Sequence, residues 1–189
     1  MNEKEAIVEA SQQLKNGAVI LCPTDTIWGL SCDATNEEAV QKIIQLKNRP
    51  TEKGFIVLVN SDRMINQCVR DLPEVVWDLI DLAEKPLSIV LEGGQYIAKN
   101  ALHKSGTIAI RMVKSGICFD LLRRFNKPII STSPNISGEP TPYSFADIQD
   151  GIINQVDYIF PKNLVPVPST ILSKIISIRP NGEVKVLRK

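Results

Sequence analysis

The chain has 189 residues, of which 43% are hydrophobic and 23% are charged, and its formal net charge at pH 7 is +1. This length and composition are typical of one globular domain whose core needs neither disulfides nor a metal. A charge so close to zero excludes a protein that binds nucleic acid through its whole surface, so such binding would need a local patch. The N-terminal segment lacks the apolar stretch of a signal peptide, and no apolar run approaches about 18 residues. We therefore expect a cytoplasmic protein that does not enter a membrane.

Cysteine and histidine usage excludes several kinds of site. The four cysteines, Cys22, Cys32, Cys68 and Cys118, are scattered and form no C-x-x-C pair, so we expect buried thiols rather than disulfides or a zinc site. The single histidine, His103, cannot supply a multi-histidine metal site, and its polar surroundings predict a surface loop. Neither a G-x-S-x-G nor a Walker A sequence occurs.

Hydrophobic periodicity predicts helices that alternate with strands. Apolar residues at helical spacing predict a first helix over 3–15, and a short apolar run predicts a buried strand over 18–22. The stretch 35–38 resembles a capping box for the second helix. We expect that helix to stop near Arg49, because Pro50 disfavours helical backbone in the residue before it.

The rest of the chain continues this alternation. The expected strands are 55–59, 87–91 and 107–112, and the expected helices are 73–82 and 118–125. The apolar run 128–130 precedes a polar loop, and 160–170 is interpreted as an extended loop. Asn181-Gly182 between two alternating runs predicts a hairpin. We therefore expect an α/β fold, one domain over 1–189 with a twisted sheet, mixed parallel and antiparallel, flanked by helices.

Two segments rich in hydroxyl groups border the predicted strands. Residues 131–138, STSPNISG, have the composition of an ordinary turn, and they equally suit a small anion site built from hydroxyls and backbone N–H groups. In the segment 23–30, PTDTIWGL, Thr24 and Thr26 point the same way if the backbone is extended. This segment predicts either a turn with a core tryptophan or a ligand site.

Cations mark two further segments. Lys47, Arg49 and Lys53 lie where a helix ends, so they either complement the helix dipole or bind phosphate. Alternation in TIAIRM places Thr107 and Arg111 on one strand face, and a buried arginine needs either a structural ion pair or a substrate anion. The four segments together contain hardly any candidate nucleophile or general base. They indicate a pocket for a nucleotide and a small anionic substrate, with catalysis by positioning and charge stabilisation.

The same segments, in chain order, resemble the motifs of the YrdC-like family of threonylcarbamoyl-AMP synthases. PTDTIWGL is similar to P-T-x-T-x-[YW]-G-L, LKNRPTEKGFIVLV to the K-x-R-P motif and its strand, TIAIR to a T/S-x-A-x-R strand, and STSPNISGEPT to an S-T-S-A-N-x-S-G-x-x-[ST] loop. PST at 168–170 and IRPNG at 178–182 resemble the closing S-T and I-R-x-G elements. The length is similar to that of short, single-domain members.

The resemblance implies a YrdC-like sheet with a concave, positively charged face and a nucleotidyltransferase reaction. L-threonine and bicarbonate (or CO₂) form a carbamate that attacks the α-phosphorus of ATP, and pyrophosphate leaves. The product, threonylcarbamoyl-AMP, serves the N6-threonylcarbamoyl modification of adenosine 37 in tRNA. The implied partners are a tRNA threonylcarbamoyl transferase complex that receives the product and, by direct contact, tRNA or double-stranded RNA. We expect Mg²⁺ to be held by the phosphates, because no acidic cluster marks a protein site.

The resemblance also implies roles residue by residue. The ATP-binding residues that it implies are Lys47, Arg49, Lys53, Thr107, Ser131, Ser133, Asn135, Thr141 and Arg179. The threonine-binding residues that it implies are Thr24, Thr26, Arg111 and Ser169. The residues implied to be catalytic are Lys47, Arg49, Ser133 and Asn135. The chain departs from the family pattern at Leu58, where a histidine often stands, and in AEKPLSIVL, where a tryptophan-proline-glycine-proline segment is common.

Two other functions stay open. A YrdC-like RNA-binding or ribosome-maturation factor would bind RNA by shape and charge without adenylate chemistry, but it would not need Thr24, Thr26 and Arg111 together. A carbamoyl-adenylating enzyme that uses carbamoyl phosphate would resemble the YrdC-like domain of hydrogenase-maturation carbamoyltransferases. Those chains carry zinc-finger and acylphosphatase-like parts that do not fit in 189 residues.

Overall fold

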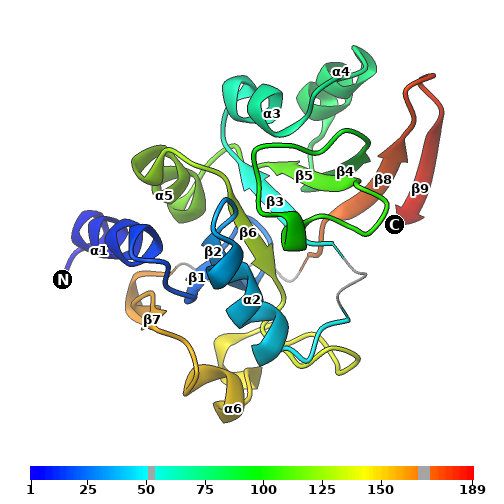
Figure 1. Cartoon of the computed structure of the whole chain (residues 1–189). Helices are drawn as coiled ribbons and strands as arrows, with labels where there is room; N and C mark the ends of the chain where they lie inside the picture. Colours follow the sequence, from blue (N-terminus) through cyan, green and yellow to red (C-terminus); the bar gives the residue numbers. More distant parts are fainter. Residues whose placement is uncertain (51–53, 166–170) are drawn as a thin grey trace.

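The computed structural model describes residues 1–50, 54–165 and 171–189. In this part of the chain, strands form a nine-stranded sheet in the order β7-β1-β2-β6-β3-β5-β4-β8-β9 (Figure 1). The strands are β1 (Ile20–Pro23), β2 (Trp28–Asp33), β3 (Ile56–Val59), β4 (Leu87–Leu91), β5 (Ile108–Met112), β6 (Ile129–Thr132), β7 (Tyr158–Ile159), β8 (Lys174–Ile178) and β9 (Val184–Arg188). The α-helices are α1 (Glu3–Lys15), α2 (Glu37–Leu46), α3 (Asp62–Cys68), α4 (Val75–Leu82), α5 (Ile117–Phe125) and α6 (Asp150–Ile153). Three parallel pairs (β1–β7, β3–β5 and β4–β8) lie among antiparallel ones, so the predicted mixed sheet flanked by helices is confirmed.

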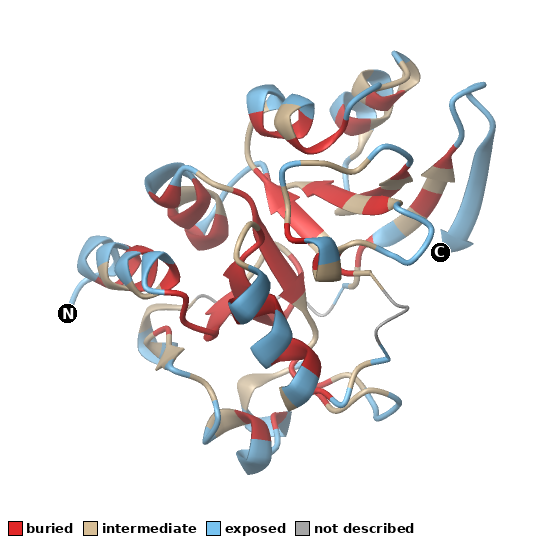
Figure 2. Ribbon diagram, viewed as in Figure 1, coloured by how far each residue is buried: buried red, intermediate tan, exposed pale blue. Residues whose placement is uncertain are grey.

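The helices pack on the sheet and on one another. Helix α1 contacts α5 and both contact β1, whereas α2 packs on β2. Helix α1 begins at a capping box, in which the Asn2 side chain accepts from the Glu5 N–H and the Glu5 carboxylate accepts from the Asn2 N–H. Figure 2 shows that the buried residues run along the central strands, while β9 at the sheet edge is exposed along its length.

Strand pairing determines which side chains share a face of the sheet. Ser131 on β6 lies opposite Ser31 on β2 and Ile56 on β3, and Arg111 on β5 lies opposite Ser88 on β4. Residues paired in this way point to the same side, so these serines and Arg111 share one face. The alternate residues are apolar and buried; among them are Val57, Ile89, Ile110 and Ile130. One face of the sheet is therefore apolar, and the other carries the polar groups beside buried apolar residues such as Leu58 and Ile129.

Most predicted elements are confirmed to within a few residues. Helix α1 and strand β4 coincide with the predicted ranges, and the terminal hairpin forms around Asn181-Gly182. The sequence does not predict β2, because PTDTIWGL has the composition of a turn; residues 24–27 form the connection of the β1–β2 hairpin, and Trp28 already belongs to the strand. It also misses α3, α6 and β7, which are too short for a clear period. The loop predicted over 160–170 contains a 3₁₀ turn at Lys162–Leu164, and its end lies outside the described residues.

The second helix ends three residues earlier than expected near Arg49. Asn48 adopts a left-handed backbone (φ 48°), the Arg49 N–H donates to the Ile44 carbonyl at 2.9 Å, and the Asn48 N–H donates to the Gln45 carbonyl at 3.0 Å. These two bonds form a Schellman motif, which stops α2 at Leu46 before Pro50 can act. Because Asn48 reverses the chain direction, the side chains of Lys47 and Arg49 point to different places.

The cysteines and the histidine lie where their residue types predict. All four cysteines are buried and free, and His103 is exposed, with Nδ1 2.7 Å from the Ser105 hydroxyl. Within the described ranges, no helix combines the length and apolar character needed to cross a membrane. The same residues hold no group of three or more histidines, cysteines or acidic residues suited to a metal ion.

Gly54 allows β3 to approach the segment around His103, and its substitution should destabilise the fold. A Cβ at this position would lie 2.7 Å from the His103 backbone nitrogen, so backbone must move to admit it. We expect Gly54→Ala to lower the free energy of unfolding by about 1–3 kcal/mol in chemical denaturation. Gly151→Ala is the matched control, since nothing lies within 4 Å of its Cβ and alanine favours a helix. Equal stability of the two variants would contradict the tight approach.

Candidate functional site

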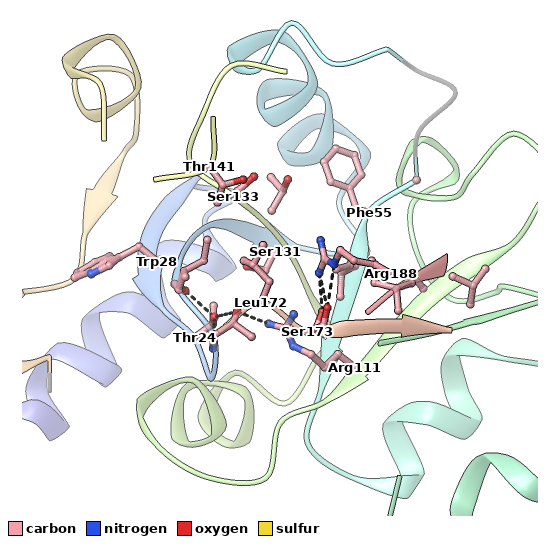
Figure 3. Close-up of a pocket in the computed structure, with 18 of the residues that line it drawn as sticks. Thr24, Trp28, Phe55, Arg111, Ser131, Ser133, Thr141, Leu172, Ser173 and Arg188 are labelled. Carbon is pink, nitrogen blue, oxygen red and sulfur yellow. Dashed lines mark hydrogen bonds between the residues drawn. The ribbon is translucent and has the colours of Figure 1, made fainter. Parts of the chain in front are cut away.

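A cavity of about 330 Å³ lies on the polar face of the sheet (Figure 3). Its walls come from the β1–β2 hairpin, the segment after α2, strands β3, β5, β4 and β8, the loop after β6 and the end of β9. The charged residues that line it are Arg49, Arg111 and Arg188, and no described carboxylate joins them. Three guanidinium groups from distant parts of the chain converge here without lining acids, so the cavity is suited to an anion.

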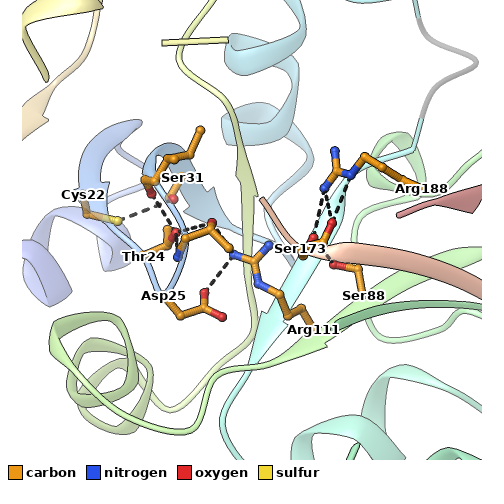
Figure 4. Close-up of polar contacts among 10 residues, drawn as sticks. Cys22, Thr24, Asp25, Ser31, Ser88, Arg111, Ser173 and Arg188 are labelled. Carbon is orange, nitrogen blue, oxygen red and sulfur yellow. Dashed lines mark hydrogen bonds and ion pairs between the residues drawn. The ribbon is translucent and has the colours of Figure 1, made fainter. Parts of the chain in front are cut away.

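Arg111 lies deep in the cavity and is only partly satisfied by protein groups. Its side chain is 5% exposed, and Nη2 lies 2.9 Å from Asp25 Oδ1 and 3.4 Å from Thr26 Oγ1 (Figure 4). Its buried Nε has no acceptor among the described residues. The structural ion pair considered from the sequence therefore exists, yet one donor of the guanidinium stays available for an acceptor supplied by a ligand.

The Thr24 and Thr26 hydroxyls form a directed chain beside Arg111. Thr24 Oγ1 donates to the Ile27 carbonyl at 2.7 Å, so in the 2.9 Å contact between the two hydroxyls Thr26 is the donor. Both hydroxyl protons are thus used within the protein. Thr24 Oγ1 also accepts from the Thr26 N–H at 3.1 Å, so both of its lone pairs are used. Thr26 Oγ1 accepts from Arg111 at 3.4 Å and keeps one lone pair for an N–H or O–H group of a ligand.

Glycine in β2 makes room for a cavity hydroxyl. A Cβ at Gly29 would lie 2.2 Å from Ser131 Oγ, which means that the Ser131 hydroxyl occupies the space a side chain would take. Trp28 beside it is buried and packs edge-on against Phe145, with ring centroids 5.0 Å apart. Trp28 is thus a core tryptophan, as one interpretation of PTDTIWGL expects, and it also lines the cavity; the ligand site of the other interpretation stays a prediction.

Lys47 joins the end of α2 to the loop after β6. Its ammonium donates to the carbonyl oxygens of Ser133 and Asn135 (2.5 Å for Asn135) and to Asn135 Oδ1 at 3.3 Å, and the Ser137 N–H donates back to the Lys47 carbonyl at 2.8 Å. Desolvation, together with the nearby charge of Arg49, lowers the pKa of Lys47 to about 7. Lys47 thus positions the loop that carries Ser133.

Asn135 is also used inside this loop. Its Oδ1 accepts from the Ser133 hydroxyl at 2.6 Å, and its Nδ2 donates to the Glu139 carbonyl at 2.7 Å. Arg49 lies half-buried above the Phe55 ring, 4.5 Å from its centroid, and Nη2 donates to the Gly54 carbonyl at 2.6 Å. Burial lowers the pKa of Arg49.

The structure brings most of the predicted site residues together. Those that line the cavity are Thr24, Thr26, Arg49, Arg111, Ser131, Ser133 and Thr141. Lys47 and Asn135 bind the neighbouring loop instead of facing the cavity, and the ligand roles suggested for them stay predictions. Thr107 precedes β5, with its hydroxyl 3.2 Å from that of Ser105, and the exposed Arg179 pairs with Glu183 at 2.9 Å; neither lines the cavity. Lys53 and Ser169 lie outside the described residues.

Sequence reasoning misses several residues of the cavity, and three of them carry a ring, a hydroxyl or a charge. Phe55, Ser173 and Arg188 line it together with the predicted residues. Phe55 opens a strand that is apolar throughout, so nothing in its pattern distinguishes it. Ser173 directly precedes the terminal hairpin and Arg188 ends it; alternation predicts these strands but leaves their register against the sheet undetermined.

Comparison with known proteins places this arrangement in a family. The family model Sua5/YciO/YrdC, described as "Telomere recombination", matches residues 12–189. The chain belongs to the Sua5/YciO/YrdC family. A threonylcarbamoyl-AMP synthase of Acinetobacter baumannii is 31% identical over 161 residues, which span 82% of this chain and 85% of that relative.

Solved Sua5/YciO/YrdC structures share the fold. Pyrococcus abyssi Sua5, crystallised in complex with L-threonine, superposes with a TM-score of 0.86 over 100% of this chain at 24% identity. Escherichia coli YciO gives a TM-score of 0.84 over 100% of this chain and 90% of its own at 21% identity. This chain spans about half the length of P. abyssi Sua5, 54% of it.

Lys47 makes the stability of the fold depend on pH in a specific direction. Its pKa is near 7 in the folded protein and close to 10.5 in the unfolded chain, so unfolding takes up a proton between these values. Stability should therefore rise with pH, by about 1 kcal/mol per unit between pH 7.5 and 9. We expect the difference in unfolding free energy between the wild type and Lys47→Met to grow by that amount in denaturant titrations. If the difference in unfolding free energy between the two proteins does not change with pH across this range, the pKa of Lys47 in the folded protein is not near 7.

Proposed function

We propose that this chain makes threonylcarbamoyl-AMP and pyrophosphate from L-threonine, bicarbonate and ATP. The observation that carries the proposal is the convergence of Arg49, Arg111 and Arg188 on a cavity whose described lining residues include no carboxylate. A triphosphate and an amino acid that carries a carboxylate together need several cations and hydrogen-bond donors. The identity to a relative named threonylcarbamoyl-AMP synthase, 31% over most of both chains, supports the same reaction.

The reaction balances without a nucleophile from the protein. The amine of threonine combines with bicarbonate to give a carbamate, with loss of water. A carbamate oxygen then forms a bond to the α-phosphorus of ATP, the bond from this phosphorus to the bridging α,β-oxygen breaks, and pyrophosphate leaves with the electron pair. The chain's contribution is to hold two anions in line and to stabilise charge on the phosphoryl oxygens.

The Thr24–Arg111 end of the cavity suits the amino acid. The Arg111 Nε–H has no acceptor among the described residues and suits a carboxylate oxygen, and the remaining lone pair of Thr26 Oγ1 suits a hydroxyl or N–H donor of threonine. Donor and acceptor groups side by side match a zwitterionic amino acid better than they match a phosphate, which offers oxygen acceptors only. We assign this end to threonine, with Ser169 as a further predicted contact.

The opposite end suits the phosphates. Arg49, Ser131, Ser133 and Thr141 bring a guanidinium and three hydroxyls to the wall near the loop after β6. Lys47 and Asn135 support this wall by positioning the loop. Lys53, Thr107 and Arg179 complete the predicted ATP-binding set.

The metal and the partners belong to the same proposal. No described carboxylate lines the cavity, so these residues do not fit a protein-held Mg²⁺, and we derive no step through a metal; an ion that enters with ATP would be bound by its phosphates. Threonylcarbamoyl-AMP would pass in the cytoplasm to a transferase complex that modifies tRNA.

Arg111 gives the sharpest test of this function. The purified protein should release pyrophosphate from ATP only when L-threonine and bicarbonate are both present. Arg111→Ala should reduce this release about 10- to 100-fold, because it removes a charge-assisted hydrogen bond to the substrate. Arg123→Ala, an exposed arginine on α5, is the control and should behave like the wild type. Release that needs neither threonine nor bicarbonate would refute the proposal.

A further inference from the structure

Arg188 reaches the cavity from the last strand of the sheet and is held in one orientation. Its Nε and Nη2 donate to the Ser173 carbonyl at 3.0 and 2.7 Å, and Nη2 also lies 3.0 Å from Ser173 Oγ (Figure 4). Ser173 is itself buried, and its hydroxyl lies 2.9 Å from that of Ser88, which faces Arg111 across β4 and β5. An exposed arginine anchored through a buried serine pair is preorganised for a ligand.

Asp25 compensates the charge of Arg111, whereas no described carboxylate compensates the charge of Arg188. Arg111 and Asp25 form an ion pair of zero net charge. This pair can orient a ligand through hydrogen bonds, but it attracts an anion only weakly. No carboxylate pairs with Arg188 in the described ranges, and its Nη1 has no protein acceptor. Burial and the charge of Arg111 both lower the pKa of Arg188. The two guanidinium groups are therefore close enough to interact across the cavity that both of them line.

The proposed nucleophile carries two anionic groups. Carboxylation of the threonine amine leaves the original carboxylate and adds a carbamate, so the species that attacks ATP is a dianion. The Arg111 guanidinium, whose charge Asp25 offsets, matches one of these groups, and a second cation on the same side of the cavity would match the other. Figure 3 shows Arg111, Ser173 and Arg188 grouped on this side, across the cavity from Ser133 and Thr141.

We propose that Arg188 binds the carbamate group formed on the amino-acid nitrogen, while Arg111 binds the amino acid's own carboxylate. This inference rests on the proposed function and adds a residue to it. Arg188 would act before the transfer step by favouring the carboxylated amine over the free amine, and it would orient a carbamate oxygen toward the α-phosphorus.

The test separates the substrates in steady-state kinetics. We expect Arg188→Gln to raise the KM for bicarbonate at least tenfold in the pyrophosphate assay, with the KM for ATP changed less than twofold. Calorimetric binding of L-threonine alone, without bicarbonate, should change less than threefold in Arg188→Gln and be lost in Arg111→Ala. Arg188→Lys keeps the charge but not the fork, so its KM for bicarbonate should be intermediate. Lys185→Gln removes an exposed charge from the same strand and should match the wild type.

The outcomes distinguish this inference from the function on which it rests. An active wild type with an unchanged bicarbonate KM in Arg188→Gln overturns the role of Arg188 alone. A rise confined to the KM for ATP, or a loss of threonine binding equal to that of Arg111→Ala, also overturns it by placing Arg188 on another group. A wild type that releases no pyrophosphate overturns both. If a thermal melt shows that Arg188→Gln is unfolded, the test uses Arg188→Lys instead. A rise in its KM for bicarbonate without a rise in its KM for ATP supports the role of Arg188, and an unchanged KM for bicarbonate overturns it.

Discussion

A lysine ammonium buried at 2% exposure, with no carboxylate partner in the described chain, is stable in this fold because oxygen atoms of one loop surround it. Removing Lys47 would leave the Asn135 carbonyl oxygen without its donor, while the Ser133 carbonyl would keep the Asn135 N–H at 3.0 Å. A buried acceptor left unpaired costs about 1–3 kcal/mol. The interaction also joins two segments 86 residues apart, so that Arg49 and Ser133 face the same cavity. The phosphate end of the site depends on this connection.

Charge at the other end of the cavity is arranged differently. Asp25 neutralises Arg111 and holds it in place, at the cost of the net attraction that a free arginine would exert. Arg188 is exposed, and no carboxylate among the described residues pairs with it. The site thus combines a buried, neutral pair that orients a ligand with an outer cation that attracts anions, which suits substrates with several negative charges.

Much of the fold follows from the sequence because periodicity and turn chemistry are local. The capping of α1, the apolar run of β4 and Asn181-Gly182 each suffice for their own element. Thr24, Thr26 and Arg111 could be chosen as candidate site residues because hydroxyl groups and a cation are unusual within or beside apolar strands. Three features depended on long-range register or a single dihedral angle. These are the pairing of Arg111 with Asp25, the inward turn of Lys47 after the left-handed Asn48, and the entry of Arg188 opposite Ile175.

Strand β9 lies at the edge of the sheet, with one side paired to β8 and all five residues exposed. Edge strands with little buried surface open locally far more often than central ones, without unfolding the rest of the protein. A ligand held by Arg188 would be released whenever β9 opens, and in return it would keep β9 closed by mass action. Amide hydrogens of the β8–β9 ladder should therefore exchange more slowly when the cavity is filled, while those of the central strands would be unaffected. The occupancy of the site would thus be visible in the hydrogen exchange of this edge strand.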